Sequence, residues 1–168
     1  MPAVTILTGP IRSGKTTRLE RWVAGRGAAA RDDAAGLLQP DGPDGRLFVD
    51  IATGEAEPLE PVGPGEGAVA VGRFRFRAAA FDWANARLVA AARESAAWLL
   101  VDEVGPLELR GGGLRPGLDA ALAGQGEVLL VVRAPLVADV RAAFGLQDAR
   151  VVPAAGWPQV GQGAIGAP

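Results

Sequence analysis

The sequence predicts an α/β fold in which a mostly parallel sheet is flanked by helices. Short apolar runs rich in β-branched residues alternate with helical patterns, as expected for strands joined by crossover helices. A glycine-rich segment separates the first strand from the first helix. Between residues 28 and 78 the pattern changes to short alternating segments with dense turn signals. This segment predicts antiparallel hairpins inserted after the first helix.

The first half of the chain supports these elements in order. An apolar β-branched run at 3–8 predicts a buried strand, and the helix from Thr16 to about residue 24 ends at a doubled glycine signal. Within the insertion, Leu47, Val49 and Ile51 alternate along 46–52 and are expected on one face. Further short strands are predicted at 36–39, 58–59, 68–71 and 73–77, with a turn at 40–45.

The second half alternates more regularly. Apolar positions at helical spacing predict a helix over about 78–96, followed by a buried strand at 98–101. The remaining elements are expected in this order: a helix at 114–122, a buried strand at 128–132, a helix at 135–144 closed by Gly145, and a short strand at 151–152. We therefore expect one domain over 1–152, with 28–78 as its insertion and 153–168 as a loosely ordered tail rich in Gly, Pro and Ala.

Composition excludes many chemistries. The 168 residues include no cysteine, histidine or tyrosine, so thiolate and imidazole catalysis and thiolate or imidazole metal sites are impossible in this chain. The carboxylates and hydroxyls that remain suit a hard cation, foremost Mg²⁺. A net charge of −2, with both signs interspersed, gives no support for a nucleic-acid partner. No apolar stretch approaches the ~20 residues of a membrane span and no signal peptide is evident, so we expect a cytoplasmic protein.

The glycine-rich segment matches the pattern G-x-x-x-x-G-K-[ST]. Its residues are Gly9, Pro10, Ile11, Arg12, Ser13, Gly14, Lys15 and Thr16, and Thr17 follows. Lys15 is the only lysine among 17 basic residues. Arginine's planar fork does not replace a compact ammonium in such a loop, so composition and motif single out the same residue. The strand–loop–helix context predicts a phosphate-binding loop.

Each part of this loop has an expected role. The glycines let backbone amides turn toward phosphate oxygens, and the following helix adds its positive N-terminal dipole. Lys15 would neutralise the β- and γ-phosphates, and the Thr16 hydroxyl would bind Mg²⁺. Thr17 is assigned to the α-phosphate.

A second candidate site lies where the strand at 98–101 ends in Asp102 and Glu103. Parallel α/β sheets bind ligands at this edge. Asp102 would hold Mg²⁺ through water, and Glu103, on the other side of the strand, would orient or deprotonate the attacking water.

Residues 101–109, V-D-E-V-G-P-L-E-L, resemble the D-E-[IV]-G-x-[ML]-E-[LF] signature of a small nucleoside-triphosphatase family, which includes the human cancer-related nucleoside-triphosphatase and thermophile relatives. The strand around Gly36, the segment from Phe48 to the Thr53-Gly54 turn, and 71–74 also look similar. The resemblance implies a RecA-like P-loop core and slow, base-tolerant hydrolysis of nucleoside triphosphates with Mg²⁺. It assigns the site to residues 9–17, Asp102 and Glu103. Arg133 and the tail after 152 depart from the family pattern.

Several other residues allow two interpretations. Glu108 reaches the site or forms a local structural bond. Arg12 and Arg133 stabilise transition-state charge or, as we favour, are solvated surface arginines. Other residues expected to serve structure are Arg73, Arg75 and Arg77, on an exposed strand edge, and Trp22, Trp83, Trp98 and Trp157, in packing.

Three functions fit these features. The first is an Mg²⁺-dependent nucleoside triphosphatase acting on ATP, GTP or other nucleotides. The second is a small-molecule kinase whose acceptor pocket comes from residues 36–77, and the third is a slow nucleotide-responsive regulator. No Asn-Lys-x-Asp motif is present, so the preferred base is not predicted, and neither is a protein partner.

Overall fold

The computed structural model describes residues 2–25, 33–94 and 96–157 of the chain. The strands are β1 (Ala3–Gly9), β2 (Ala34–Leu38), β3 (Asp41–Gly42), β4 (Gly45–Asp50), β5 (Ala56–Pro58), β6 (Ala68–Val71), β7 (Phe74–Arg77), β8 (Trp98–Val104), β9 (Glu127–Arg133) and β10 (Arg150–Pro153). The helices are α1 (Lys15–Gly25), α3 (Ala78–Ala91), α4 (Pro106–Leu109), α5 (Arg115–Ala123) and α6 (Val137–Phe144), with 3₁₀ turns η1 (Ala134–Leu136) and η2 (Ala154–Gly156).

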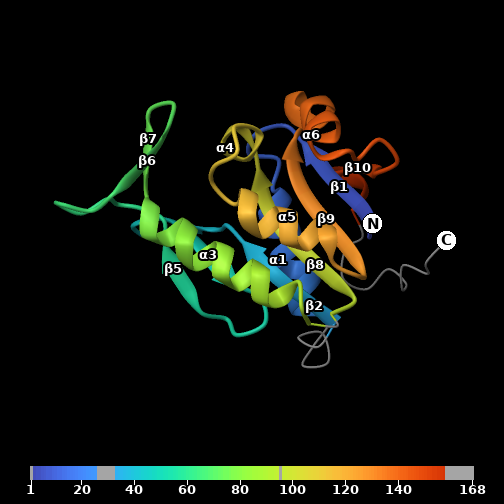
Figure 1. The fold of residues 1–168 in the computed structure, drawn as a ribbon, viewed down its shortest axis with the longest axis horizontal. Coiled ribbons are helices and arrows are strands. Elements are labelled where there is room, and N and C mark those ends of the chain that lie inside the picture. Colours follow the sequence, from blue (N-terminus) through green and yellow to red (C-terminus); the bar gives the residue numbers. More distant parts are fainter. Residues whose placement is uncertain (1, 26–32, 95, 158–168) are drawn as a thin grey trace.

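One large sheet organises the fold. Among the described residues it has eight strands in the order β10-β1-β9-β8-β2-β4-β3, with β5 paired to β4. The five strands from β10 to β2 run parallel, and β4 is antiparallel to β2. β6 and β7 form a separate antiparallel hairpin, which stands away from the main body in Figure 1. The predicted α/β class and mostly parallel sheet are therefore confirmed. The segment 28–78 is antiparallel in β3 to β7, as predicted, but β2 within it runs parallel to β8.

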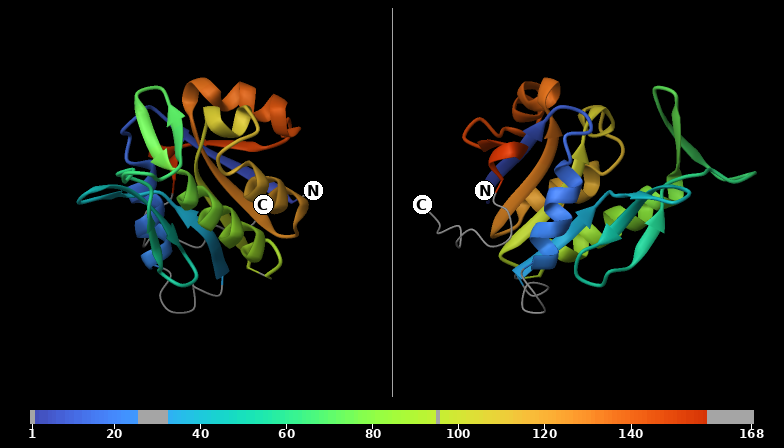
Figure 2. Two further views of the ribbon diagram at one scale, coloured as in Figure 1. Left: turned by 60° about the vertical axis from the view of Figure 1, so that its left-hand side comes forward. Right: turned by 180° about the vertical axis from the view of Figure 1, so that it is seen from behind.

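Helices cover both faces of the sheet. On one face α3 and α5 pack side by side over the strands (Figure 1), where the larger apolar cluster contains Phe81, Leu88 and Leu118. On the other face, seen from behind in Figure 2, α1 contributes Leu19 and Trp22 to a second cluster. Burial of these two faces fixes how the strand ends are arranged relative to α1.

The second cluster contains three of the four tryptophans. Trp22 lies edge-on to Trp98 and Trp157, with ring centroids 5.8 and 5.7 Å apart. The expectation that tryptophans pack rather than stack on a base is thus met by these three. Trp157 is buried and η2 precedes it, so the segment 153–157 belongs to the fold, and the predicted loose tail starts too early. The rest of that predicted tail, residues 158–168, lies outside the described residues.

Gly36 explains how β2 reaches the parallel sheet. It has φ +107°, and a Cβ there would lie 2.1 Å from the Leu100 carbonyl oxygen of neighbouring β8. Only glycine allows both the backbone conformation and the close approach. Its position places the end of β2 next to the acidic end of β8.

Two details of the predicted elements were wrong. α3 ends at Ala91 rather than near 96, because an alanine-rich run carries no glycine or proline stop signal. The alternating strand predicted over 46–52 ends at Asp50, so Ile51 lies beyond β4. Within β4 the buried residues are Phe48 and Asp50, whereas Leu47 and Val49 are half-buried. None of the described helices is long and apolar enough to cross a bilayer.

Candidate phosphate-binding and catalytic site

The site is built where parallel strands end together. β1 lies beside β9, and β9 lies beside β8, so β1 and β8 are separated by one strand. The register pairs Gly9 of β1 with Arg133 of β9, and Val104 of β8 with Val132 of β9. The glycine-rich loop, the acidic pair and Arg133 therefore meet at one sheet edge, the position where open α/β sheets bind ligands.

The loop from β1 to α1 contains two residues with positive φ, one of which is not a glycine. Arg12 and Gly14 have φ of 59° and 74°, and a Cβ on Gly9 would lie 2.8 Å from the Ser13 hydroxyl. Successive residues in such conformations turn backbone N–H groups toward a common centre. Arg12 is exposed, as favoured from the sequence.

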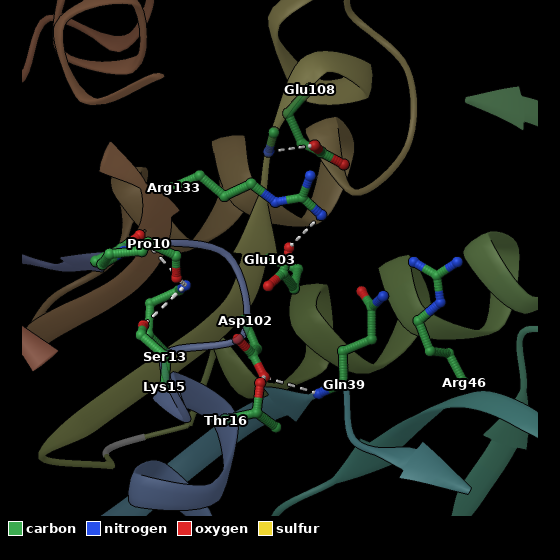
Figure 3. Close-up of polar contacts among 12 residues, drawn as sticks. Pro10, Ser13, Lys15, Thr16, Gln39, Arg46, Asp102, Glu103, Glu108 and Arg133 are labelled. Atoms are coloured by element: carbon green, nitrogen blue, oxygen red, sulfur yellow. Dashed lines mark hydrogen bonds and ion pairs between the residues drawn. The ribbon is translucent and has the colours of Figure 1, made fainter. Parts of the chain in front are cut away.

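Lys15 is held inside this loop. Its side chain is buried, and Nζ donates to the Pro10 carbonyl at 2.8 Å (Figure 3). The Gly9 carbonyl lies 3.4 Å from Nζ. The ammonium therefore lies at the centre of the loop that precedes α1. The helix dipole and the positive charge of Lys15 act on the same small volume, which suits it to bind an anion.

The loop and the acidic strand are joined by one hydrogen bond. The Thr16 hydroxyl donates to Asp102 Oδ2 at 2.8 Å, and the Gln39 backbone N–H donates to the same oxygen at 3.0 Å (Figure 3). Three elements, α1, β8 and the end of β2, thus converge on one carboxylate. The contribution of Gln39 was missed, since a backbone donor leaves no signal in the sequence.

Asp102 fits a divalent cation. The residue is 1% exposed, and its Oδ1 has no hydrogen-bond partner among the described residues. Burial raises the pKa of Asp102 to about 7, a rise that hydrogen bonds from Gln39 and Thr16 oppose. A buried carboxylate oxygen that lacks a donor is suited to bind a cation, directly or through water, and the Thr16 hydroxyl beside it is a second oxygen ligand.

The raised pKa of Asp102 predicts a pH-dependent stability. In EDTA, the unfolded chain ionises this carboxyl near its ordinary pKa of 3.8, whereas the folded protein ionises it near 7. The free energy of unfolding should therefore fall by about 4 kcal/mol as pH rises from about 4 to 7, and Asp102→Asn should remove this loss. Urea denaturation across pH measures it, with the exposed Asp119→Asn as control. Parallel pH profiles for the wild type and Asp102→Asn would contradict the assignment.

β8 is irregular where its carboxylates lie. Val101 pairs with Leu130 but Val104 pairs with Val132, so three steps along β8 match two along β9. Glu103 sits in this bulge with φ of 60°, a conformation rare for a residue other than glycine. Bulges of this kind redirect side chains beside active sites, and the strain costs about 1–3 kcal/mol.

Because of the bulge, the side chains of Asp102 and Glu103 point in different directions. Asp102 turns toward Thr16, whereas Glu103 turns toward Arg133, whose guanidinium donates to Glu103 Oε2 at 3.2 Å (Figure 3). Arg133 was favoured as a solvated surface arginine; its side chain is indeed 41% exposed, but it also forms an ion pair with Glu103 that the sequence did not predict. Its role depends on β8 and β9 being neighbours, which the sequence alone does not specify.

Glu108 forms local structural hydrogen bonds, the second of its two interpretations from the sequence. It is buried and accepts hydrogen bonds from the backbone N–H groups of Gly105 and Leu114, each at 2.8 Å. Burial raises its pKa, and these two bonds oppose the rise. Glu108 therefore ties α4 to the start of α5 and shapes the loop behind Glu103.

The arginines at 73, 75 and 77 divide into two groups. Arg73 and Arg75 are exposed, as expected for a charged strand edge. Arg77 instead binds Glu57 at 2.6 Å and Glu66 at 3.2 Å, which fastens the base of the β6–β7 hairpin to β5. The predicted exposed face is therefore correct only for the two residues nearer the turn.

The strand–loop–helix with its lysine and threonine, and the acidic strand end one strand away, define a P-loop NTPase with a RecA-like core. A family model described as NTPase matches residues 4–152. The chain belongs to this family and is a nucleoside triphosphatase, which confirms the family resemblance of its sequence.

Two solved structures share the fold. The human cancer-related nucleoside triphosphatase is 22% identical, with a TM-score of 0.66 over 90% of this chain and 88% of that one. THEP1 from the hyperthermophile Aquifex aeolicus is 20% identical, with a TM-score of 0.61 over 89% of this chain and 88% of that one. A search of curated proteins gave no match.

Proposed function

We propose that this chain hydrolyses the γ-phosphate of nucleoside triphosphates such as ATP and GTP in an Mg²⁺-dependent reaction. The observation that carries the proposal is the 2.8 Å hydrogen bond from Thr16 to Asp102, which joins the phosphate loop to a buried carboxylate with an unpaired oxygen. These two groups are the ones that P-loop enzymes use for Mg²⁺.

The proposal assigns phosphate binding to the loop and cation binding to Thr16 and Asp102. The ammonium of Lys15 and the backbone N–H groups of the loop, which Pro10 lacks, would bind the phosphates. Thr17, in the first turn of α1, is assigned to the α-phosphate. Thr16 and Asp102 would hold the cation. When bound, Mg²⁺ would neutralise charge that develops on the β- and γ-phosphate oxygens.

Glu103 supplies the base in this proposal. Its carboxylate lies at the same edge as Asp102 but faces away from Thr16 (Figure 3). In this proposal the attacking water approaches the γ-phosphate from the side of Glu103. This carboxylate accepts a proton as water attacks phosphorus, and the diphosphate leaves with the bridging oxygen. Arg133, bound to Glu103, orients that carboxylate and places positive charge near the reacting phosphoryl group.

Phosphate release from purified protein, without any acceptor, tests the proposal. With Mg²⁺ we expect steady release from ATP, GTP, CTP and UTP, and with EDTA in place of Mg²⁺ we expect release to fall at least about a hundredfold. Asp102→Asn should weaken activation by Mg²⁺, whereas Asp119→Asn, an exposed carboxylate on α5, should not. Equal turnover in Mg²⁺ and EDTA would contradict the cation site.

The same assay separates the alternatives. A kinase would convert the nucleoside triphosphate to its diphosphate only when a metabolite acceptor is added, with the phosphoryl group ending on that acceptor. A regulator would bind nucleotide without steady turnover. A cytoplasmic location and the absence of a nucleic-acid partner stay predictions of the sequence.

A further inference from the structure

A pocket of about 290 Å³ lies beside the candidate base. Its walls come from the turn between β6 and β7, from the segment that carries α4, and from the ends of β8 and β9. Figure 3 labels several of its side chains, which are Gln39, Arg46, Glu103, Glu108 and Arg133. The proposed hydrolysis uses only Glu103 and Arg133 from this lining, so most of the pocket has no assigned role.

One wall of the pocket is aromatic, and the outermost ring of this wall is open to solvent. Phe74 is 42% exposed and stacks on Phe76, with ring centroids 6.2 Å apart and planes 7° apart. Phe81 completes this wall from α3. Exposure of a phenylalanine costs free energy that a bound apolar or aromatic molecule would recover.

The rim of the pocket is cationic. Three arginines line it, and two are already paired: Arg46 with Glu60 at 2.7 Å and Arg133 with Glu103 at 3.2 Å. Arg73, at the hairpin turn, has its guanidinium 5.1 Å from the centre of the Phe74 ring and forms no ion pair with another described residue. An aromatic wall beside an unpaired guanidinium favours a ligand with an aromatic body and an anionic group.

The pocket lies at the γ-phosphate end of the nucleotide site. This step rests on the proposed function, in which Thr16 and Asp102 would hold a cation beside the phosphates and Glu103, at the end of β8, faces the γ-phosphate. The nucleoside, attached through the α-phosphate, extends away from that end. A molecule in the pocket would therefore be a second ligand rather than the base of the same nucleotide.

We propose that this pocket binds a small aromatic anion as a second ligand, and that its occupation shields Glu103 from water and slows hydrolysis. The ring packs on Phe74, and the anionic group pairs with Arg73. The occupant then covers the approach by which water reaches the γ-phosphate, so binding and turnover are linked through Glu103.

Titration with 8-anilinonaphthalene-1-sulfonate, an aromatic sulfonate that fluoresces when its surroundings are apolar, tests the site. We expect saturable one-to-one binding to the wild type and a roughly tenfold weaker Kd for Phe74→Ala and for Arg73→Gln. Val151→Ala removes another exposed apolar side chain, and Arg75→Gln removes the next exposed arginine of the hairpin, outside this pocket. Both control variants should bind as the wild type does.

A second measurement tests the link to turnover. Phosphate release by the wild type should fall as the probe saturates its site, and release by Phe74→Ala should resist the same concentrations. Lys15→Arg should keep probe binding while losing turnover, so loss of the nucleotide site and loss of the pocket give different results. Unchanged affinity in both pocket variants, or turnover that stays constant while the pocket fills, would overturn the proposal.

Discussion

Lys15→Arg is expected to lower nucleoside-triphosphate turnover by at least about a hundredfold, the usual cost of removing one preorganised group that stabilises transition-state charge. The exchange keeps the positive charge, and the chain uses arginine at each of its other basic positions. A loss of this size would therefore arise from geometry alone.

The structure explains why geometry matters at this position. Lys15 is 5% exposed, and its Nζ is surrounded by the Pro10 and Gly9 carbonyl oxygens within the loop. A guanidinium is wider and planar, and it would have to displace those carbonyls or leave the loop. Either change moves the charge away from the position where the β- and γ-phosphates bind.

Steady-state phosphate release measures the effect. Arg21→Lys is the matched control, since it makes the reverse exchange at an exposed position on the same helix and should leave turnover unchanged. Turnover in Lys15→Arg close to that of the wild type would show that the loop does not bind the phosphates in the proposed way.

Glu103→Gln is expected to lower kcat by about a hundredfold to ten-thousandfold, the range for losing a general base, while nucleotide affinity stays unchanged. The amide keeps the size and the hydrogen-bonding oxygen of the carboxylate but accepts no proton at neutral pH. Nucleotide affinity should persist because Glu103 faces Arg133 rather than the phosphate loop.

The Glu103–Arg133 ion pair supplies the control. Arg133→Gln removes the same 3.2 Å contact and leaves the carboxylate in place, so it should lower kcat less than Glu103→Gln does. Rapid-mixing measurements of turnover, together with equilibrium binding of nucleotide, separate the two effects. If both variants lost the same activity, Glu103 would act only by positioning Arg133.

The parts of the site that are local in sequence could be predicted. Residues 9–17 are consecutive, and a phosphate-binding loop needs glycine, lysine and a hydroxyl at fixed spacing, so the motif can be found in the sequence alone. Asp102 could also be found, because an apolar run that ends in acid marks the carboxyl end of a buried strand. These features were enough to predict both the fold class and the family from the sequence.

The parts that depend on neighbouring strands could not be predicted. The Gln39 N–H reaches Asp102 only because β2 lies beside β8. Arg133 reaches Glu103 only because β9 also lies beside β8 and β8 has a bulge at Glu103. No glycine marks the bulge in the sequence, because the residue with φ of 60° is Glu103. Pairing and bulges are tertiary properties, which local patterns do not encode.

Turnover in water enriched in ¹⁸O tests the central claim, that water attacks the γ-phosphorus at the site formed by Lys15, Asp102 and Glu103. The protein should release inorganic phosphate carrying one ¹⁸O from solvent and a nucleoside diphosphate carrying none, and Glu103→Gln should slow the appearance of both products together. Solvent label in the nucleotide product, or release of pyrophosphate, would place the attack at another phosphorus and contradict the proposed mechanism.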